Sequence, residues 1–333
     1  MLLRLRYLLN RARRLSPANL LGFAGRIAAG SGRSRLGILI DMLWCSVRYE
    51  TAFQDYADWD FHLLTGAERR TYMTHPKSNH LVERYNAKEF RHTFRDKVEF
   101  NAAFAPHIGR DWLDVRESTP EQLQAFGAKH GRIMAKVPDS LSGLGIKSHR
   151  ADEISDWAAF RETLLAGRQF LLEEFITQHP DMASLEPTSV NSLRMITFAE
   201  KGKVTVLAAV LKMGNGGDVD NFSGGGMYTM LNEQGVAEHP AFDAAGGTFA
   251  VHPRSGTSIV GFQVPLYAET LALLDEVAGQ VPEMPYIGWD VAIGPDRPML
   301  IEGNPNSGVY QLKPSLSGVR TGLLPRYREV MHF

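Results

Sequence analysis

The sequence predicts an α+β fold preceded by a mainly helical N-terminal region. Three observations support this prediction. Short apolar runs of strand length, separated by glycine-rich turns, begin after residue 130. Two pairs of these runs flank tight turns, as the strands of β-hairpins do. The stretch 41–95 is rich in aromatic and charged residues and lacks strand-like alternation, which favours helices there.

The composition fits a globular protein without an overall charge preference. The chain has 333 residues, 44% of them hydrophobic, which is enough for a sizeable core and more than one lobe. Its 36 basic and 37 acidic residues nearly cancel, which argues against nucleic acid as the main partner. The single cysteine, Cys45, excludes an intramolecular disulfide framework and a thiolate-rich zinc site. We therefore predict a reducing, cytoplasmic location, with Cys45 as a small buried side chain.

Residues 1–40 form a basic arm with eight arginines and no acidic residue. Leucines alternate with the arginines at roughly helical spacing, a pattern typical of a helix on an anionic surface. The arm lacks the uninterrupted apolar core of a secretory signal, and no apolar run in the chain has the length of a transmembrane helix. Two interpretations stay open: peripheral contact with the inner face of a membrane, or a helix packed on its own domain with a solvated basic face.

The part of the chain after residue 130 begins with alternating strand-like and helical stretches. Residues 131–137 and 169–176 are short apolar runs that predict strands. Between them lie a turn-rich segment at 139–147 and a helical stretch near 152–166. A proline-bearing loop is expected at 177–189.

Two β-hairpins are predicted beyond that loop. The runs SLRMITFA and KVTVLAAVLKM are joined at Glu200-Lys201-Gly202, a short turn between apolar stretches. A glycine-rich loop (214–226) follows, then a further strand pair and a helix from Pro265 to about Ala278. The runs IGWDVAI and PMLIEGN flank residues 294–297 and predict the second hairpin.

This second hairpin carries the most specific chemical signal. Its turn places Asp290 across from about Glu302, and directly opposed strand residues lie ~5 Å apart at Cβ on one face. Asn304 shares that face because side chains alternate with a period of two. Two buried carboxylates this close need a shared proton or a cation. An all-oxygen set suits Mg²⁺, so we predict a magnesium site here; the alternative is a solvated hairpin with two acids.

Cationic residues and glycines upstream are candidates for contacts to phosphate. Lys136 ends a strand and precedes Ser142, Gly143 and Gly145, where glycine lets backbone N–H groups approach phosphate oxygens. Arg194 and Lys212 lie on the two arms of the first hairpin and suit a triphosphate or an acyl phosphate. Each cation taken alone is also compatible with a surface side chain that extends its charge to solvent.

Two further segments have two interpretations each. Glu173 and Glu174, with Phe175 and Ile176 after them, close a strand where a carboxylate and the backbone would receive a purine and ribose. The alternative is a solvated strand end. Asn221, followed by Ser223-Gly224-Gly225-Gly226, would form a second anion-binding nest or only a flexible linker.

In this order, the candidate residues resemble the ATP-grasp superfamily. The stretches 252–265 (HPRSGTSIVGFQVP) and 285–304 (PYIGWDVAIGPDRPMLIEGN) look like the sugar-transfer-associated ATP-grasp subgroup. The resemblance covers about 95 to 310. The residues that carry it are Lys97 after Asp96, Lys136 with its glycine loop, Glu173-Glu174, Arg194, Lys212, Asn221 with Gly224-Gly225, Asp290, and Glu302-x-Asn304.

The resemblance implies two α+β subdomains that grip ATP. Lys97, Lys136 and the loop with Ser142, Gly143 and Gly145 would contact its phosphates. Glu173, Glu174, Phe175 and Ile176 would line adenine and ribose. Lys212 would reach the β and γ phosphates, Arg194 would stabilise the transferred phosphoryl group, and Asn221 would complete this catalytic set. Asp290, Glu302 and Asn304 would bind one or two magnesium ions.

The resemblance also implies a reaction class and a domain organisation. Most members join a carboxylate to an amine through an acyl phosphate, so we expect a biosynthetic ligase acting on small molecules, for example in glycan assembly. A kinase and an ATP-binding accessory protein of a glycan-assembly complex stay open as alternatives. The expected parts are a helical region at 1–95, an N-terminal ATP-grasp subdomain at 96–180 and a C-terminal subdomain at 181–333. The helical first part departs from the α/β first domain common in the superfamily.

Overall fold

The computed structural model describes residues 17–140, 144–217, 220 and 222–333. The chain divides into two compact units. Unit 1 contains Met1–His80 and Gln311–Phe333, and unit 2 contains Leu81–Tyr310. The subdomain boundaries expected after residues 95 and 180 stay predictions. In the described part of the chain, no helix combines the length and the apolar character needed to cross a membrane.

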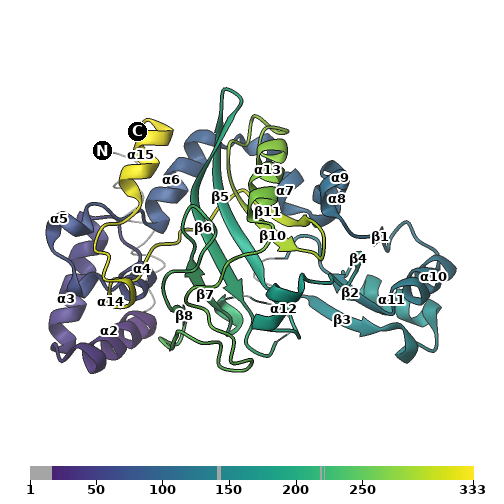
Figure 1. Cartoon of the computed structure of the whole chain (residues 1–333), viewed down its shortest axis with the longest axis horizontal. Helices are drawn as coiled ribbons and strands as arrows, with labels where there is room; N and C mark the ends of the chain where they lie inside the picture. Colours follow the sequence, from purple (N-terminus) through teal and green to yellow (C-terminus); the bar gives the residue numbers. More distant parts are fainter. Residues whose placement is uncertain (1–16, 141–143, 218–219, 221) are drawn as a thin grey trace. The chain divides into compact units, whose positions relative to one another are not determined.

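Unit 1 is mainly helical, which confirms the predicted helical N-terminal region. Its core is aromatic: Tyr56, Trp59, Phe61 and Tyr72 are buried, with ring centroids 5.2 to 6.4 Å apart. Cys45 is also buried, as predicted, and burial raises the pKa of its thiol to about 12. The helices are α2 (Pro17–Ser31), α3 (Arg35–Arg48), α4 (Phe53–Asp58), α5 (Gly66–Arg69), α6 (His75–Tyr85, ending in unit 2), α14 (Pro314–Ser317) and α15 (Leu324–Met331) (Figure 1).

Helix α3 begins with a cap and is fixed to the rest of unit 1 by a part-buried ion pair. The Ser34 hydroxyl accepts a hydrogen bond from Gly37 N at 3.1 Å and so satisfies a free N–H of the first turn. Arg69 donates to both oxygens of Asp41, at 2.7 and 2.6 Å, and the Tyr56 hydroxyl donates to Asp41 at 2.6 Å. Asp41 therefore faces the interior of unit 1 with its charge compensated.

Unit 2 contains a four-stranded antiparallel sheet in the order β1-β4-β2-β3. The apolar side chains of Ile133, Leu164 and Leu172 form part of its core, which α10 and α11 help to build. The strands are β1 (Trp112–Asp114), β2 (Arg132–Lys136), β3 (Ile146–Arg150) and β4 (Leu171–Glu174), and the helices are α10 (Pro120–His130) and α11 (Trp157–Ala166).

Unit 2 also contains a seven-stranded antiparallel sheet in the order β11-β10-β5-β6-β7-β8-β9 (Figure 1). Both predicted hairpins are confirmed, because β5 pairs with β6 and β10 pairs with β11. The strands are β5 (Ser192–Glu200), β6 (Lys203–Met213), β7 (Met227–Met230), β8 (Ala241–Asp243), β9 (Thr248–Phe249), β10 (Tyr286–Ile293) and β11 (Pro298–Asn304), and α13 (Tyr267–Val277) corresponds to the predicted helix near 265–278.

An aromatic cluster supports β10 and β11 from the face opposite Glu302. The rings of Phe94, Phe100 and Phe104 surround Trp289 on β10, with centroids 5.5 to 6.5 Å away. The phenylalanines come from α7 (Arg91–Arg95), α8 (Lys97–Ala103) and the residue between α8 and α9 (Ala105–Ile108). Gly303 on β11 faces the same cluster, where a Cβ atom would lie 2.6 Å from Phe94 Cδ1. Glycine at this position lets the rings pack directly against the strand.

Two differences from the sequence prediction have local causes. The expected loop at 177–189 contains α12 (Pro180–Leu185), which begins with a proline in its first turn, where no N–H is needed. The turn-rich segment at 139–147 ends in β3, so that Lys136 pairs with Ile146. β2 and β3 therefore form a hairpin, with Gly145 directly before β3.

Candidate active site

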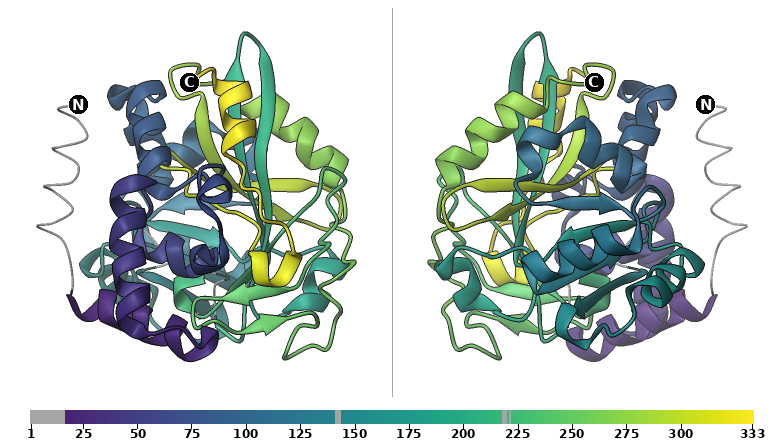
Figure 2. Two further views of the ribbon diagram at one scale, coloured as in Figure 1. Left: turned by 90° about the vertical axis from the view of Figure 1, so that its left-hand side faces the viewer. Right: turned by 90° about the vertical axis from the view of Figure 1, so that its right-hand side faces the viewer.

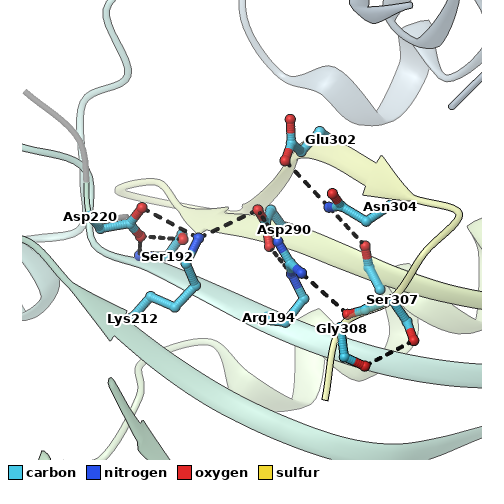
Figure 3. Close-up of polar contacts among 10 residues, drawn as sticks. Ser192, Arg194, Lys212, Asp220, Asp290, Glu302, Asn304, Ser307 and Gly308 are labelled. Carbon is cyan, nitrogen blue, oxygen red and sulfur yellow. Dashed lines mark hydrogen bonds and ion pairs between the residues drawn. The ribbon is translucent and has the colours of Figure 1, made fainter. Parts of the chain in front are cut away.

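Three charged residues lie in one row across neighbouring strands of the large sheet. Asp290 on β10 pairs with Glu302 on β11 and with Arg194 on β5, which confirms the predicted register of residues 290 and 302. Lys212 on β6 pairs with Ser192, two residues before Arg194. Because side chains two residues apart on a strand share a face, Lys212 joins the row on the same side of the sheet (Figure 3).

Asp290 is the centre of a buried ion-pair network. Arg194 donates through Nε to Asp290 Oδ1 and through Nη2 to Asp290 Oδ2, the latter at 2.9 Å. Lys212 Nζ lies 3.5 Å from Asp290 Oδ2 and 3.4 Å from Asp220 Oδ1. Asp220 also accepts hydrogen bonds from the backbone N–H and the hydroxyl of Ser192 (Figure 3). The four charged side chains are only 7–13% exposed, so their charges are largely desolvated.

The charges of this network stabilise one another. Burial acts to raise the pKa of Asp290, but the Arg194 guanidinium and the Lys212 ammonium lower it to about 2. Burial alone would lower the pKa of Lys212, but the carboxylates of Asp220 and Asp290 raise it above its usual value. Asp290 is therefore ionised and Lys212 protonated at neutral pH.

Glu302 and Asn304 lie beside this network at the end of β11. Asn304 Nδ2 donates to Glu302 Oε1 at 3.3 Å and to Gly288 O at 3.2 Å, and both side chains are half-buried. Carboxylate and amide oxygens suit magnesium, so this pair fits a divalent cation. Asp290 fits less directly, because both of its oxygens already accept from Arg194. The assignment of all three residues as magnesium ligands stays a prediction.

A second charged cluster lies on the small sheet. Lys136, the last residue of β2, forms an ion pair with Glu173 on β4. Glu173 also accepts from Arg110 Nη2 at 2.6 Å and from Asn101 Nδ2 at 2.7 Å. Its side chain is 1% exposed; burial acts to raise its pKa, but Arg110 and Lys136 lower it to about 2. The Glu173 carboxylate is thus held by three donors from the protein itself.

Lys97 and Glu302 interact electrostatically with each other and with charged residues of the two clusters. Lys97 Nζ donates to Pro138 O at 3.2 Å and to Ser140 O at 2.7 Å, both in the β2–β3 hairpin loop. Burial lowers the pKa of Lys97, against the attraction of the Glu302 carboxylate. Arg194 also interacts electrostatically with Glu302. Glu302 therefore lies within electrostatic reach of cations from both clusters.

The sequence that forms this site matches a family model. Residues 127–329, more than half of the chain, match the model described as sugar-transfer associated ATP-grasp. The chain belongs to this ATP-grasp family. The match includes Lys136, Arg194 and the whole β10–β11 hairpin, but it does not reach Lys97. No curated protein matches the chain.

Several solved structures of ATP-grasp and related enzymes are similar to the chain at low identity. ATP-grasp ligase PsnB, in a structure with a phosphomimetic variant of its minimal precursor, Mg and ADP, is 14% identical, with a TM-score of 0.44 over 74% of this chain and 61% of that chain. The chain thus spans less than two thirds of that protein. D-alanyl-alanine synthetase A from Vibrio cholerae O1 biovar eltor is 12% identical (TM-score 0.40; 64% and 56% covered), and D-cycloserine synthetase DcsG is 13% identical (TM-score 0.40; 76% and 76% covered).

In this ATP-grasp protein, the residues predicted to line the nucleotide each contact a different group of the protein. The Glu174 carboxylate accepts a backbone N–H at 2.9 Å. The Arg132 guanidinium lies over the Phe175 ring, 3.6 Å from its centroid, and Ile176 is buried in a small apolar cluster. Contact of these residues with adenine and ribose stays a prediction. Three predicted residues lie outside the described residues: Ser142, Gly143 and Asn221.

Two charged residues of these clusters, Asp220 and Arg110, are not among the residues predicted from the sequence. Asp220 stands beside Asn221 in the glycine-rich loop, where an acid next to a candidate anion nest gave no reason to assign it. Its contact with Lys212 depends on how the loop packs against β5. Arg110 is 63 residues from its partner Glu173, and no local pattern indicates such a pair.

Gly145 is expected to be required at the base of the β2–β3 loop. Its φ is +71°, and a Cβ atom would lie 2.6 Å from Val137 Cγ2. We expect Gly145→Ala to lower the free energy of unfolding by about 1–3 kcal/mol, measured by urea denaturation. Gly202→Ala is the matched control, because Gly202 has φ +77° but no heavy atom within 4 Å of its would-be Cβ. Equal losses in both variants would contradict the role of the Val137 contact.

Proposed function

We propose that this ATP-grasp protein is an ATP- and magnesium-dependent ligase that activates a carboxylate as an acyl phosphate and joins it to an amine. The observation that carries the proposal is the row of Arg194, Asp290 and Glu302 with Lys212 beside it. Two buried cations, held in place by carboxylates, stand next to oxygen donors that suit a metal. This combination fits a triphosphate whose terminal phosphoryl group is transferred.

The site residues would assist the reaction through charge and position. The substrate carboxylate attacks the γ-phosphorus, the bond to the β,γ-bridging oxygen breaks, and ADP leaves with that electron pair. The amine then attacks the acyl carbon, phosphate leaves, and the amine loses a proton. Arg194 and Lys212 would offset the negative charge on the transferred group, since their own positions are fixed before the reaction begins. Magnesium held by Glu302 and Asn304 would neutralise phosphate oxygens when bound.

Trapping of the acyl phosphate tests this proposal. Purified protein is incubated with Mg-ATP and a panel of carboxylates, with hydroxylamine in place of the amine. A hydroxamate, together with ADP release that an added amine accelerates, supports the ligase. A stable phosphorylated product without any need for an amine indicates a kinase instead. ATP binding without turnover over the whole panel indicates an ATP-binding accessory protein.

Lys136→Gln is expected to weaken ATP binding. The substitution removes a charge-assisted contact worth about 1.5–3 kcal/mol, which corresponds to roughly a 10- to 100-fold rise in Kd. Calorimetry with a non-hydrolysable ATP analogue and magnesium measures the effect.

Lys147→Gln is the control for that measurement, because Lys147 lies on the partner strand β3 of the same hairpin but is exposed. Circular dichroism shows whether the loss of the Glu173 pair changes the fold. Unchanged nucleotide affinity in folded Lys136→Gln would place the phosphates elsewhere.

A further inference from the structure

Helix α3 of unit 1 is apolar on two faces. One face contains Ile38, Met42 and Cys45, which are buried in unit 1. The other face, called here the α3 face, is exposed. Its residues follow the spacing i, i+4, i+7, i+8 and i+11, which places them on one side of a helix. They are Leu36, Ile40, Leu43, Trp44 and Val47, with exposed fractions of 65, 60, 41, 57 and 48%.

The α3 face is a concentrated patch. Of the twelve large apolar side chains that the described residues expose, these five lie on one helix, and Leu21 on neighbouring α2 adds a sixth. The left view of Figure 2 looks onto α2 and α3 of unit 1, the two purple helices. A contiguous apolar patch on a helix that is already anchored by its opposite face marks an interaction surface.

The exposed charged residues of α2, α3 and the short segment between them are all arginines. Arg26, Arg33, Arg35 and Arg48 are exposed. The one acidic residue of the described parts of α2 and α3 is Asp41, and it pairs with Arg69 inside unit 1. An exposed apolar stripe bordered by arginines and without exposed acid matches a surface that combines negative charge with an apolar layer beneath it.

We propose that the α3 face docks on an anionic lipid membrane, with its apolar side chains at the boundary between head groups and acyl chains and the arginines on lipid phosphates. Trp44 suits this boundary because its ring is apolar and its indole N–H is polar. The proposal is independent of the ligase reaction. It replaces the general expectation for residues 1–40 with a defined surface on a folded helix.

Charge argues against two other occupants. In a dimer formed through two α3 faces, the arginines of both copies would approach each other without acidic partners. The segment 1–16 of the chain itself contains five arginines and no acid, so packing it on the α3 face would also bring like charges together. An anionic membrane surface avoids the repulsion between arginines that both of these arrangements would cause.

Vesicle flotation with the full-length protein tests the proposal. We expect binding to vesicles with phosphatidylglycerol, weak binding to pure phosphatidylcholine, and loss of binding in high salt, since screening acts over ~8 Å at physiological ionic strength. The variant Leu36→Gln/Ile40→Gln/Trp44→Gln is expected to raise the lipid concentration for half-binding by about tenfold or more. Arg33→Gln/Arg48→Gln is expected to weaken binding to anionic vesicles only.

The matched control is Leu63→Gln/Val251→Gln/Val260→Gln, which removes three exposed apolar side chains elsewhere and should bind as the wild type does. Quenching by brominated lipids reports insertion of Trp44 and should fall in Trp44→Phe, which keeps the face apolar. Equal vesicle binding by the α3-face variant and the wild type overturns the proposal. So does a wild-type protein that ignores anionic vesicles, or a wild-type dimer in ultracentrifugation that the α3-face variant dissociates.

Discussion

Glu302→Ala is expected to reduce turnover by roughly 10³-fold or more without unfolding the protein. The Glu302 carboxylate lies opposite Asp290, accepts a hydrogen bond from Asn304, and interacts electrostatically with Lys97 and Arg194. Among these groups, Asp290 cannot readily replace it as a metal ligand, because Arg194 already binds both oxygens of Asp290. The side chain is half-buried, so truncation leaves no sealed cavity in the core.

ADP release at saturating ATP and acceptor, titrated with magnesium, measures this effect. Glu302→Gln keeps the shape of the side chain but removes its charge and should lose activity as well. Asp296→Ala removes an exposed acid from the turn of the same β10–β11 hairpin and should leave turnover unchanged. Near-normal activity in Glu302→Ala would contradict the assignment of Glu302 as a metal ligand.

Asp290→Asn is expected to cost stability as well as activity. The substitution leaves the buried Arg194 guanidinium without its bidentate carboxylate, and Lys212 keeps only Asp220 of its two carboxylate partners. Breaking a buried pair from one side destabilises proteins by about 3–5 kcal/mol. Urea unfolding at neutral pH measures the loss. A variant as stable as the wild type would mean that the Arg194–Asp290 pair is not the main support of this end of the sheet.

The same variant should change how stability depends on pH. The pKa of Asp290 is about 2 in the folded protein, below its ordinary value of 3.8, so folding favours the ionised form. The resulting stability is fully present above about pH 4 and is lost as the pH falls towards 2. Asp290→Asn removes this contribution and should flatten the decline. Unfolding curves at pH 5, 4 and 3 compare the two proteins; a decline of equal steepness would contradict the ion-pair account.

The two hairpins were predictable because short stretches of consecutive residues, the turns and the apolar runs beside them, specify each hairpin. Glu200-Lys201-Gly202 and residues 294–297 are short turns between apolar runs, and a turn fixes the register of both strands. The turn sets the pairs from Ile293–Pro298 to Val291–Leu300, and a one-residue register shift next to Asp290 then brings it opposite Glu302. Helix α10 had a local signal as well, a capping box between Thr119 and Gln122 with a proline at the first helical position, which the sequence analysis did not use.

The partners of the buried charges were not predictable in the same way. Arg194 and Lys212 taken singly suggested surface side chains, and their burial follows from contacts with Asp290 across three strands. The Glu173 carboxylate, expected near a ribose, is enclosed by Arg110, Lys136 and Asn101. Contacts across sheets and between distant helices depend on tertiary packing, for which one sequence carries no periodic signal.

The close contact at Gly303 makes the Glu302-x-Asn304 motif conditional on residues far away in the chain. Glu302 and Asn304 face the site, whereas the residue between them meets the rings of Phe94 and Phe100 on the other side of β11. Position 303 therefore accepts only glycine while these rings are present, although the motif Glu302-x-Asn304 allows any residue there. The effects of substitutions at positions 94, 100 and 303 therefore depend on one another. A side chain larger than glycine at position 303 is tolerated only if Phe94 or Phe100 is first replaced by a smaller residue. Substitutions on the helices that carry Phe94 and Phe100 and substitutions on β11 are thus linked, because Gly303 has no Cβ atom.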